Sequence, residues 1–333
     1  MDKINKSLKC SNFQNKISYI VNLLIIFILL YSPNLKKKEN FIFNYSKEKD
    51  YNYLKFAIIQ RKCKACGLFS FYIVFLGCIH KYLLDGFIPI IDIKSFPNVL
   101  NGFDISKVNA WEYFFEQPFG YTLEEVLKNA KNIVKIICDD CTPRPDPNPM
   151  FFNSNDKYFW HNFANKYSSI KKELILLSNK MRYSLFHNSK NVLGVLTRGT
   201  DYISRKPKSH PIPPDILDLI QDVKMFDIKY NYDYIFFSTE DENIREQFSK
   251  NFVKKIRQLK PNIKLNYDYK KKNFLNFNEN IKGNVEFNKI YLLNIILLSK
   301  CIDIITARCS GAAGIFILTN GFRNSKVYDL GEY

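Results

Sequence analysis

The chain has 333 residues, of which 46% are hydrophobic, so it can bury a large core, and its length favours two domains over one. Its formal net charge of +17 raises the question of a nucleic-acid partner. Lysine, however, is spread along the whole chain together with Asn, Ile, Phe and Tyr, and no stripe of Lys and Arg follows one predicted helix. We therefore expect no nucleic acid as partner and attribute the charge to a compositional bias, with a modest attraction to phosphates and anionic lipids.

The first 53 residues hold one apolar segment, which begins at Ile17, ends at Ser32 and is flanked by lysines on both sides. At about 1.5 Å per residue, a helix of this length falls short of the roughly 30 Å hydrocarbon core of a membrane. Three interpretations stay open: a membrane-associated anchor, a signal peptide without a small-residue cleavage pattern, and a packed helix. We predict a hydrophobic helix and a polar linker over residues 1–53, and a location in the cytoplasm or at the cytoplasmic face of a membrane.

Eight cysteines in a chain of this length, several of them inside apolar runs, are typical of a reducing compartment rather than of a disulfide scaffold. Two pairs, Cys63 with Cys66 and Cys138 with Cys141, have the spacing of metal ligands. The pairs lie about seventy residues apart, whereas a compact zinc ribbon separates its pairs by roughly 15 to 20 residues. We expect no metal site, and a structural zinc at these four cysteines is the alternative.

A first domain is predicted over residues 54–150, and it opens with a βαβ unit. Gly67 and Ser70 lie at the start of its helix, where free backbone N–H groups can receive an anion or a sugar hydroxyl; a simple turn is the alternative. Asp92 lies near the end of the second strand, within reach of the same crevice. The unit consists of strands at 54–60 and 87–93 around an apolar helix at 68–84.

An aromatic segment at 109–118 carries Glu112 and Glu116 one helical turn apart. Aromatic rings are good platforms for sugars and a carboxylate can act as a base, although core packing is the commoner explanation of such a cluster. A strand at 132–138 and the Pro-rich residues 142–149 then close the domain.

A second domain is predicted over residues 151–333, where short apolar runs alternate with amphipathic helices. This alternation is typical of a parallel, doubly wound sheet, so we predict an α/β fold. Pro214 suits the first turn of one helix. The predicted strands cover residues 192–197, 234–238, 263–267, 302–306 and 327–330, and the predicted helices cover about 156–186, 214–223, 244–252, 287–299 and the segment after 310.

Polar clusters follow three of these strands, and the carboxyl ends of parallel strands meet at one edge of a sheet. We therefore expect the clusters to line one ligand site. They are Arg198 with Asp201, Thr239 with Asp241, and Arg308 with Ser310 and Gly311.

The third cluster has the most specific chemistry. Ser310 and Gly311 at a helix N-terminus offer backbone donors, a hydroxyl and the positive end of the helix dipole to a phosphate. The sequence has neither a Walker loop nor a Gly-x-Gly-x-x-Gly motif, which disfavours a classical nucleotide hydrolase or dehydrogenase.

These motifs resemble those of the fucosyltransferase-like glycosyltransferases, a group that contains nodulation and N-glycan core α-1,6-fucosyltransferases and protein O-fucosyltransferases. The chain looks closest to bacterial members of this group, and the likeness covers roughly residues 62–333. It implies a GT-B architecture of two Rossmann-like domains, with GDP-fucose bound mainly by the C-terminal one and with inverting, metal-independent transfer. The matching segments are Gly194-Val-Leu-Thr-Arg-Gly-Thr-Asp-Tyr202, His210-Pro-Ile-Pro, Ser238-Thr-Glu-Asp241 and Ser310-Gly311.

The resemblance has one departure. The family's first motif has two adjacent arginines, and here Arg198 matches one while Gly199 occupies the place of the other. Arg308 and Arg205 are the candidates for the missing cation. A fixed guanidinium and helix-terminal amides can stabilise the negative charge that develops on a departing nucleoside diphosphate without a metal.

The other roles follow from the same likeness and from residue chemistry. Asp241 would lie near the nucleotide base or ribose, with an N-cap as the alternative, and Ser310 with Gly311 near the diphosphate. Asp201 is expected to orient Arg198 or its loop, and an ion pair that braces a turn is the alternative. His210 is expected as a loop residue of the substrate region held by its prolines. The candidates for the acceptor base are Asp92, Glu112 and Glu116.

We therefore predict a glycosyltransferase that moves fucose from GDP-fucose to a glycan or surface-polysaccharide acceptor, with a possible membrane contact through the segment that begins at Ile17. Two alternatives stay open. One is a basic nucleic-acid-binding protein, and the other is a catalytically silent protein that binds a sugar nucleotide with the same fold.

Overall fold

The computed structural model describes residues 51–138, 143–146, 148–259, 267, 269–270, 275, 278–279 and 282–333. The predicted hydrophobic helix at residues 17–32 and most of the predicted strand at 263–267 lie outside the described residues. Within them, no helix combines the length and the hydropathy needed to cross a membrane.

The N-terminal lobe is built on a three-stranded sheet in the order β2-β1-β3, in which neighbouring strands are parallel. β1, α3 and β2 form the expected βαβ unit. The elements of this lobe are β1 (Lys55–Gln60), α3 (Leu68–Leu84), β2 (Ile88–Asp92), the 3₁₀ turns η1 (Ala110–Tyr113) and η2 (Pro118–Gly120), α4 (Leu123–Asn129) and β3 (Asn132–Ile137).

The C-terminal lobe is built on a five-stranded sheet in the order β6-β5-β4-β7-β8, again parallel throughout. The expected α/β class with parallel sheets is therefore confirmed. The elements of this lobe are β4 (Val192–Leu196), α7 (Thr200–Ser204), α8 (Ile216–Tyr230), β5 (Tyr234–Ser238), α9 (Glu242–Asn251), β6 (Ile256–Arg257), α10 (Val285–Ser299), β7 (Asp303–Ala307), α11 (Ser310–Leu318) and β8 (Asn324–Tyr328). Between the lobes the chain forms η3 (Pro149–Phe151), α5 (Ser154–Tyr167) and α6 (Lys172–Phe186).

Several predicted boundaries differ from the structure. The partner of β5 is the two-residue strand β6, which comes earlier in the chain than the strand predicted at 263–267. β8 begins before the strand predicted at 327–330. The prediction missed its first residues because Ser325 and Lys326 are polar residues on a partly exposed edge strand and do not form an apolar run. Pro214 precedes α8 instead of opening it, since Oδ1 of Asp215 accepts a hydrogen bond from the Leu217 N–H at 2.7 Å and caps the helix.

The order of the five strands reverses direction at β4. β5 lies on one side of this first strand and β7 on the other, so the chain leaves the carboxyl ends of β4 and β7 toward opposite faces of the sheet. Ligands of open α/β sheets bind in the crevice that such a reversal creates. Arg198 follows β4 and Ser310 follows β7, so the fold itself brings these two residues to one crevice.

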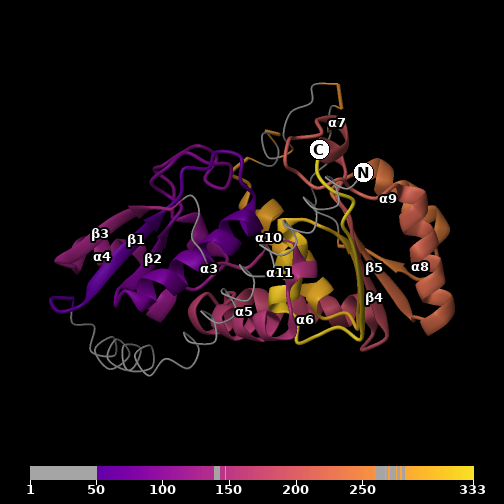
Figure 1. Ribbon diagram of the computed structural model, residues 1–333, viewed down its shortest axis with the longest axis horizontal. Coiled ribbons are helices and arrows are strands. Elements are labelled where there is room, and N and C mark those ends of the chain that lie inside the picture. Colours follow the sequence, from indigo (N-terminus) through magenta and orange to yellow (C-terminus); the bar gives the residue numbers. More distant parts are fainter. Residues whose placement is uncertain are drawn as a thin grey trace, which may run out of the picture.

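The two lobes share α10 and α11, which lie between the sheets in Figure 1. α11 is buried on all sides because its sequence, Ser-Gly-Ala-Ala-Gly-Ile-Phe-Ile-Leu, has no charged residue. Gly314 in this helix allows α3 to approach closely, since a Cβ at Gly314 would lie 2.2 Å from Cδ1 of Phe69. The N-terminus of α3 is thereby fixed beside that of α11, and one continuous apolar core runs through both lobes.

Candidate functional site

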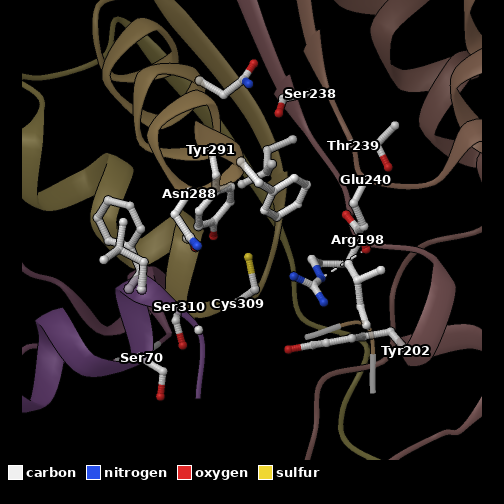
Figure 2. A pocket seen from close by; sticks show the side chains of 18 of the residues that line it. Ser70, Arg198, Tyr202, Ser238, Thr239, Glu240, Asn288, Tyr291, Cys309 and Ser310 are labelled. Atoms are coloured by element: carbon white, nitrogen blue, oxygen red, sulfur yellow. Dashed lines mark ion pairs between the residues drawn. The ribbon is translucent and has the colours of Figure 1, made fainter. Parts of the chain in front are cut away.

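A cavity of about 340 Å³ lies between the lobes, at the carboxyl ends of β4 and β5 and the N-termini of α3 and α11. Its volume is within the range of about 300–1,000 Å³ that small-molecule sites occupy. Figure 2 shows Arg198, Tyr202 and Glu240 on one wall and Ser70 and Ser310 on the opposite one. Of the ten residues predicted for the site, the cavity wall contains Arg198, Asp201, Gly67, Ser70, His210, Thr239, Ser310 and Gly311.

Arg198 is the principal cation of the cavity. Its Nη2 donates to Oδ1 of Asp201 at 3.1 Å, and its Nε lies 3.2 Å from Oε1 of Glu240 without forming a hydrogen bond. The guanidinium also stacks on the ring of Tyr202 at 4.5 Å. Burial lowers the pKa of Arg198, but the two carboxylates raise it by more, so its pKa is well above the ordinary value. Arg198 therefore keeps its charge, and among the described residues its Nη1 has no hydrogen-bond partner.

The turn after β4 is held by the residues that follow β5. The N–H groups of Gly199 and Thr200 donate to Oε1 of Glu240 at 2.9 Å and to Oδ2 of Asp241 at 2.7 Å. Thr200 has a φ of 39°, in the left-handed region that a β-branched residue rarely adopts. The carboxylates thus stabilise a strained turn, and this turn fixes the position of Arg198.

Both carboxylate oxygens of Asp241 accept hydrogen bonds from other residues of the protein. Its Oδ1 accepts from the N–H groups of Asn243 and Ile244 and so caps α9, and its Oδ2 accepts from Thr200 and from the hydroxyl of Tyr269 at 2.6 Å. The side chain is buried and lies outside the cavity wall. Asp241 was expected near the nucleotide base or ribose, with an N-cap as the alternative, and its contacts are those of an N-cap. The neighbouring Glu240 is the carboxylate that lines the cavity.

The opposite wall is the N-terminus of α11. Sγ of Cys309 accepts from the Ala312 N–H at 3.3 Å and caps the helix, and burial raises the pKa of this free thiol. A Cβ at Gly311 would lie 2.5 Å from the hydroxyl oxygen of Tyr291, so only glycine lets this tyrosine of α10 reach the cavity. Burial raises the pKa of Tyr291, which keeps its hydroxyl neutral.

A second cation, Arg245 of α9, lines the cavity. Its Nη2 donates to the Thr239 carbonyl at 2.6 Å and its Nη1 pairs with Glu242. Arg308, one of the two candidates for the missing cation, lies outside the wall and pairs with Glu332 at 2.7 Å. The other candidate, Arg205, lies at the C-cap of α7 and is also absent from the wall. Among the described residues, Arg245 is thus the arginine that accompanies Arg198.

Arg308 contacts the segment 329–333, which lies beside the loop that carries His210. Besides its pair with Glu332 it lies 3.6 Å from Asp329. The backbone of this segment bonds to the loop that carries His210: the Tyr333 N–H donates to the His210 carbonyl at 3.1 Å. His210 is held in this way at the rim of the cavity, with its ring edge-on to that of Tyr202.

The N-terminal lobe contributes the segment before α3. Gly67 is the N-cap of α3 without a side-chain cap, and Nη1 of Arg61 donates to the Ser70 carbonyl at 2.8 Å. Cys63 and Cys66 form a disulfide that lines the cavity, and Cys78 is bonded to Cys138. These bonds contradict the expectation of free thiols, and they use three of the four sulfurs of the alternative zinc site. Cys141 lies outside the described residues.

The three carboxylates considered as acceptor base do not reach the cavity. Asp92 is buried and accepts from Gln60 at 2.6 Å and from the backbone of Lys94 at 2.8 Å. Glu112 accepts from Gln117 and from the Leu123 N–H at the start of α4, and Glu116 pairs with Lys171. The structure gives each of these side chains a local structural partner, and none of the three lines the cavity.

Comparison with known proteins gives fold neighbours only. No family model and no curated protein matches the chain. Among solved structures, it is similar to NodZ α-1,6-fucosyltransferase soaked with GDP-fucose, at 14% identity and a TM-score of 0.47, over 80% of this chain and 93% of that chain. It is also similar to fucosyltransferase NodZ from Bradyrhizobium (14% identity, TM-score 0.43, 75% and 88% covered) and to POFUT1 in complex with GDP-fucose (9%, 0.38, 82% and 74%). These neighbours are fucosyltransferases.

Proposed function

We propose that the chain is a glycosyltransferase that uses a nucleotide sugar, GDP-fucose, as donor and a glycan as acceptor, with inversion and without a metal. The observation that carries the proposal is the placement of Arg198 across the cavity from the N-terminus of α11. A diphosphate between them would meet a guanidinium with free N–H groups and the positive end of a helix dipole. The resemblance of the strand-end motifs to those of fucosyltransferase-like enzymes supports the same ligand.

The proposed step is a displacement at the anomeric carbon. The bond from this carbon to the diphosphate oxygen breaks, a bond to an acceptor hydroxyl oxygen forms, and the proton of that hydroxyl passes to the departing diphosphate or to solvent. Negative charge then grows on the departing diphosphate, where Arg198 and the backbone N–H groups at Ser310 and Gly311 stabilise it. Because Asp201, Glu240 and the turn at Thr200 already fix the guanidinium, little reorganisation is needed when the charge develops.

The acceptor belongs on the side of the N-terminal lobe in this proposal. Gly67 and Ser70 of α3 line the cavity opposite the C-terminal sheet, and His210 lies at the rim. The carboxylates of the described cavity wall are Asp201 and Glu240, and both pair with Arg198. We therefore attribute the rate of the step to stabilisation of the leaving group.

The test compares Arg198→Ala and Arg198→Lys with the wild-type chain, and Arg182→Ala serves as the control. Arg182 lies on α6, outside the cavity, and its Nη2 donates to the Ser189 carbonyl. Loss of a preorganised charge stabiliser typically lowers kcat by about 10²–10³-fold, so we expect this loss for both Arg198 variants with unchanged circular dichroism. Full transfer activity in Arg198→Ala would overturn the proposal.

Donor screening separates the finer claims. Thermal shift with GDP, UDP, ADP and their sugar conjugates identifies the nucleotide, and stabilisation only by a nucleotide other than GDP would overturn the GDP-fucose assignment. Sugar-nucleotide binding without turnover across a broad acceptor panel would instead identify a catalytically silent binding protein.

A further inference from the structure

The hydroxyl group of Tyr291 lies against the N-terminus of α11. Tyr291 belongs to α10 and lines the cavity between the lobes. Its contact on α11 is Gly311, where a Cβ atom would lie 2.5 Å from the hydroxyl oxygen and 3.6 Å from Cζ of the same ring. Figure 2 shows the hydroxyl directed into the cavity, on the side of Cys309 and Ser310.

The ring of Tyr291 is held where α3, α10 and α11 meet. Phe69 of α3 packs edge-on against it, with the ring centroids 5.8 Å apart. Phe69 is itself buried and fixed by its close contact with Gly314 of α11. The hydroxyl therefore has a fixed position, and a fixed dipole needs little reorganisation when a charge develops beside it.

The hydroxyl of Tyr291 is a neutral hydrogen-bond donor. Burial raises its pKa most and the Cys309 thiol raises it further, whereas the nearby guanidinium of Arg198 offsets only a part. The proton thus stays on the oxygen at neutral pH. Among the described residues this hydroxyl forms no hydrogen bond, so its donor capacity is open to a ligand in the cavity.

The position of this donor selects the part of the ligand that it meets. The N-terminus of a helix favours an anion, and Arg198 on the other wall favours one as well. A hydroxyl between these groups faces the diphosphate of the proposed donor. Its O–H then points at the atoms on which negative charge grows during the transfer.

We propose that Tyr291 is a further catalytic residue of the transfer, whose hydroxyl donates a hydrogen bond to an oxygen of the departing diphosphate. This inference rests on the proposed function, because it assigns a donor to the leaving group of that reaction. The electron pair of the breaking bond stays on the diphosphate. The tyrosine keeps its proton throughout, and its hydrogen bond strengthens as the diphosphate gains charge.

The experiment uses the full chain and the variant Tyr291→Phe, which keeps the ring and removes the hydroxyl. Release of GDP from GDP-fucose, with water as acceptor, gives kcat and KM, and calorimetry gives the dissociation constants of GDP and guanosine. Tyr121→Phe is the matched control, because Tyr121 is a buried tyrosine of the N-terminal lobe outside the cavity.

We expect Tyr291→Phe to lower kcat by about 10- to 100-fold, as for a lost hydrogen bond to a charged group, with KM nearly unchanged. GDP should bind about tenfold more weakly, since its terminal phosphate carries the charge of the leaving group. Guanosine has no phosphate, so its dissociation constant should not change. Tyr121→Phe should match the wild type in all four measurements.

Gly311→Ala tests the position of the hydroxyl independently of activity. In the wild type the new Cβ meets the hydroxyl oxygen, and the midpoint of urea denaturation should fall. In the Tyr291→Phe background the nearest ring atom would be Cζ at 3.6 Å, an ordinary contact, so the loss should largely disappear.

The outcomes that would overturn the inference are separate from failure of the proposed function. Unchanged kcat and GDP affinity in Tyr291→Phe, equal weakening of GDP and guanosine, or additive effects of the two substitutions would show that this hydroxyl does not serve the diphosphate. The wild type would still bind GDP and release it from GDP-fucose. Failure of the wild type to bind either nucleotide would overturn the proposed donor and this inference with it.

Discussion

A Cβ atom on Gly199 would lie 2.3 Å from Oδ2 of Asp241 and 2.5 Å from the Cβ of the same residue. The carboxylate has little room to retreat, since Oδ2 accepts from the Thr200 N–H at 2.7 Å and from the Tyr269 hydroxyl at 2.6 Å. Gly199 is therefore required by the turn, and this explains why the second arginine of the resembling family has no counterpart at this position.

We predict that Gly199→Ala lowers the free energy of unfolding by about 1–3 kcal/mol, the usual range for an overpacked site. Gly199→Arg should be at least as destabilising and should not tighten nucleotide binding. Urea denaturation measures the first effect and calorimetry the second. In the control Gly120→Asn, the new side chain meets nothing within 4 Å at a φ of 72° that Asn tolerates, so little stability should be lost. A stable Gly199→Arg variant with higher nucleotide affinity would contradict the prediction.

The strand-end pattern predicted the part of the site that depends on backbone topology. Arg198 and Ser310 follow buried strands directly, so parallel order alone brings them together. The choice between Glu240 and Asp241 depends on how the chain turns after β5, because consecutive residues point to different sides, and the sequence does not fix that turn.

Other parts of the site depend on tertiary packing. α10 has apolar residues around most of its circumference, so no periodic pattern marks Tyr291 or Asn294 as facing a cavity. The bond between Cys78 and Cys138 joins residues 60 positions apart, and only the packing of α3 against the sheet shows that they meet.

The contact between Gly314 and Phe69 gives a second prediction. A Cβ at Gly314 would lie within 2.3 Å of two atoms of the Phe69 ring, at the place where α11 meets α3. Gly314→Ala should therefore destabilise the fold by about 1–3 kcal/mol. If the clash with the ring is the cause, Gly314→Ala should be much less harmful in a Phe69→Ala background, and a double-mutant cycle measures this coupling. Additive effects of the two changes would show that the lobes do not depend on this contact.

The disulfides give a third prediction. Removing the Cys78–Cys138 bond opens a loop of 60 residues, whereas removing the Cys63–Cys66 bond opens one of three. The chain-entropy relation predicts a loss of about 4 kcal/mol for the first and roughly 2 kcal/mol or less for the second. Denaturation of the variants Cys78→Ala/Cys138→Ala and Cys63→Ala/Cys66→Ala checks this order.

Thiol mapping provides the independent check of those bonds. Alkylation of the unfolded, unreduced chain followed by mass spectrometry should label Cys301 and Cys309 and leave the four bonded cysteines unlabelled. Labelling of Cys78 and Cys138 under these conditions would show that the bond is absent in solution.

The tyrosine that stacks on Arg198 gives a fourth prediction, about alkaline pH. Burial raises the pKa of Tyr202 to about 12, whereas an unfolded tyrosine ionises near a pKa of about 10. Between these values the unfolded chain binds fewer protons than the folded one. The contribution of Tyr202 to the free energy of unfolding is therefore fully present below about pH 10 and is lost as the pH rises toward about 12.

Tyr202→Phe keeps the ring against the guanidinium but removes the ionisable hydroxyl. The free energy of unfolding of Tyr202→Phe should therefore increase relative to that of the wild type as the pH rises from 10 to 12. Urea denaturation at several pH values measures this difference, with Tyr53→Phe as the control because Tyr53 is 73% exposed. A difference between Tyr202→Phe and the wild type that does not change with pH would show that Tyr202 ionises alike in the folded and unfolded chains.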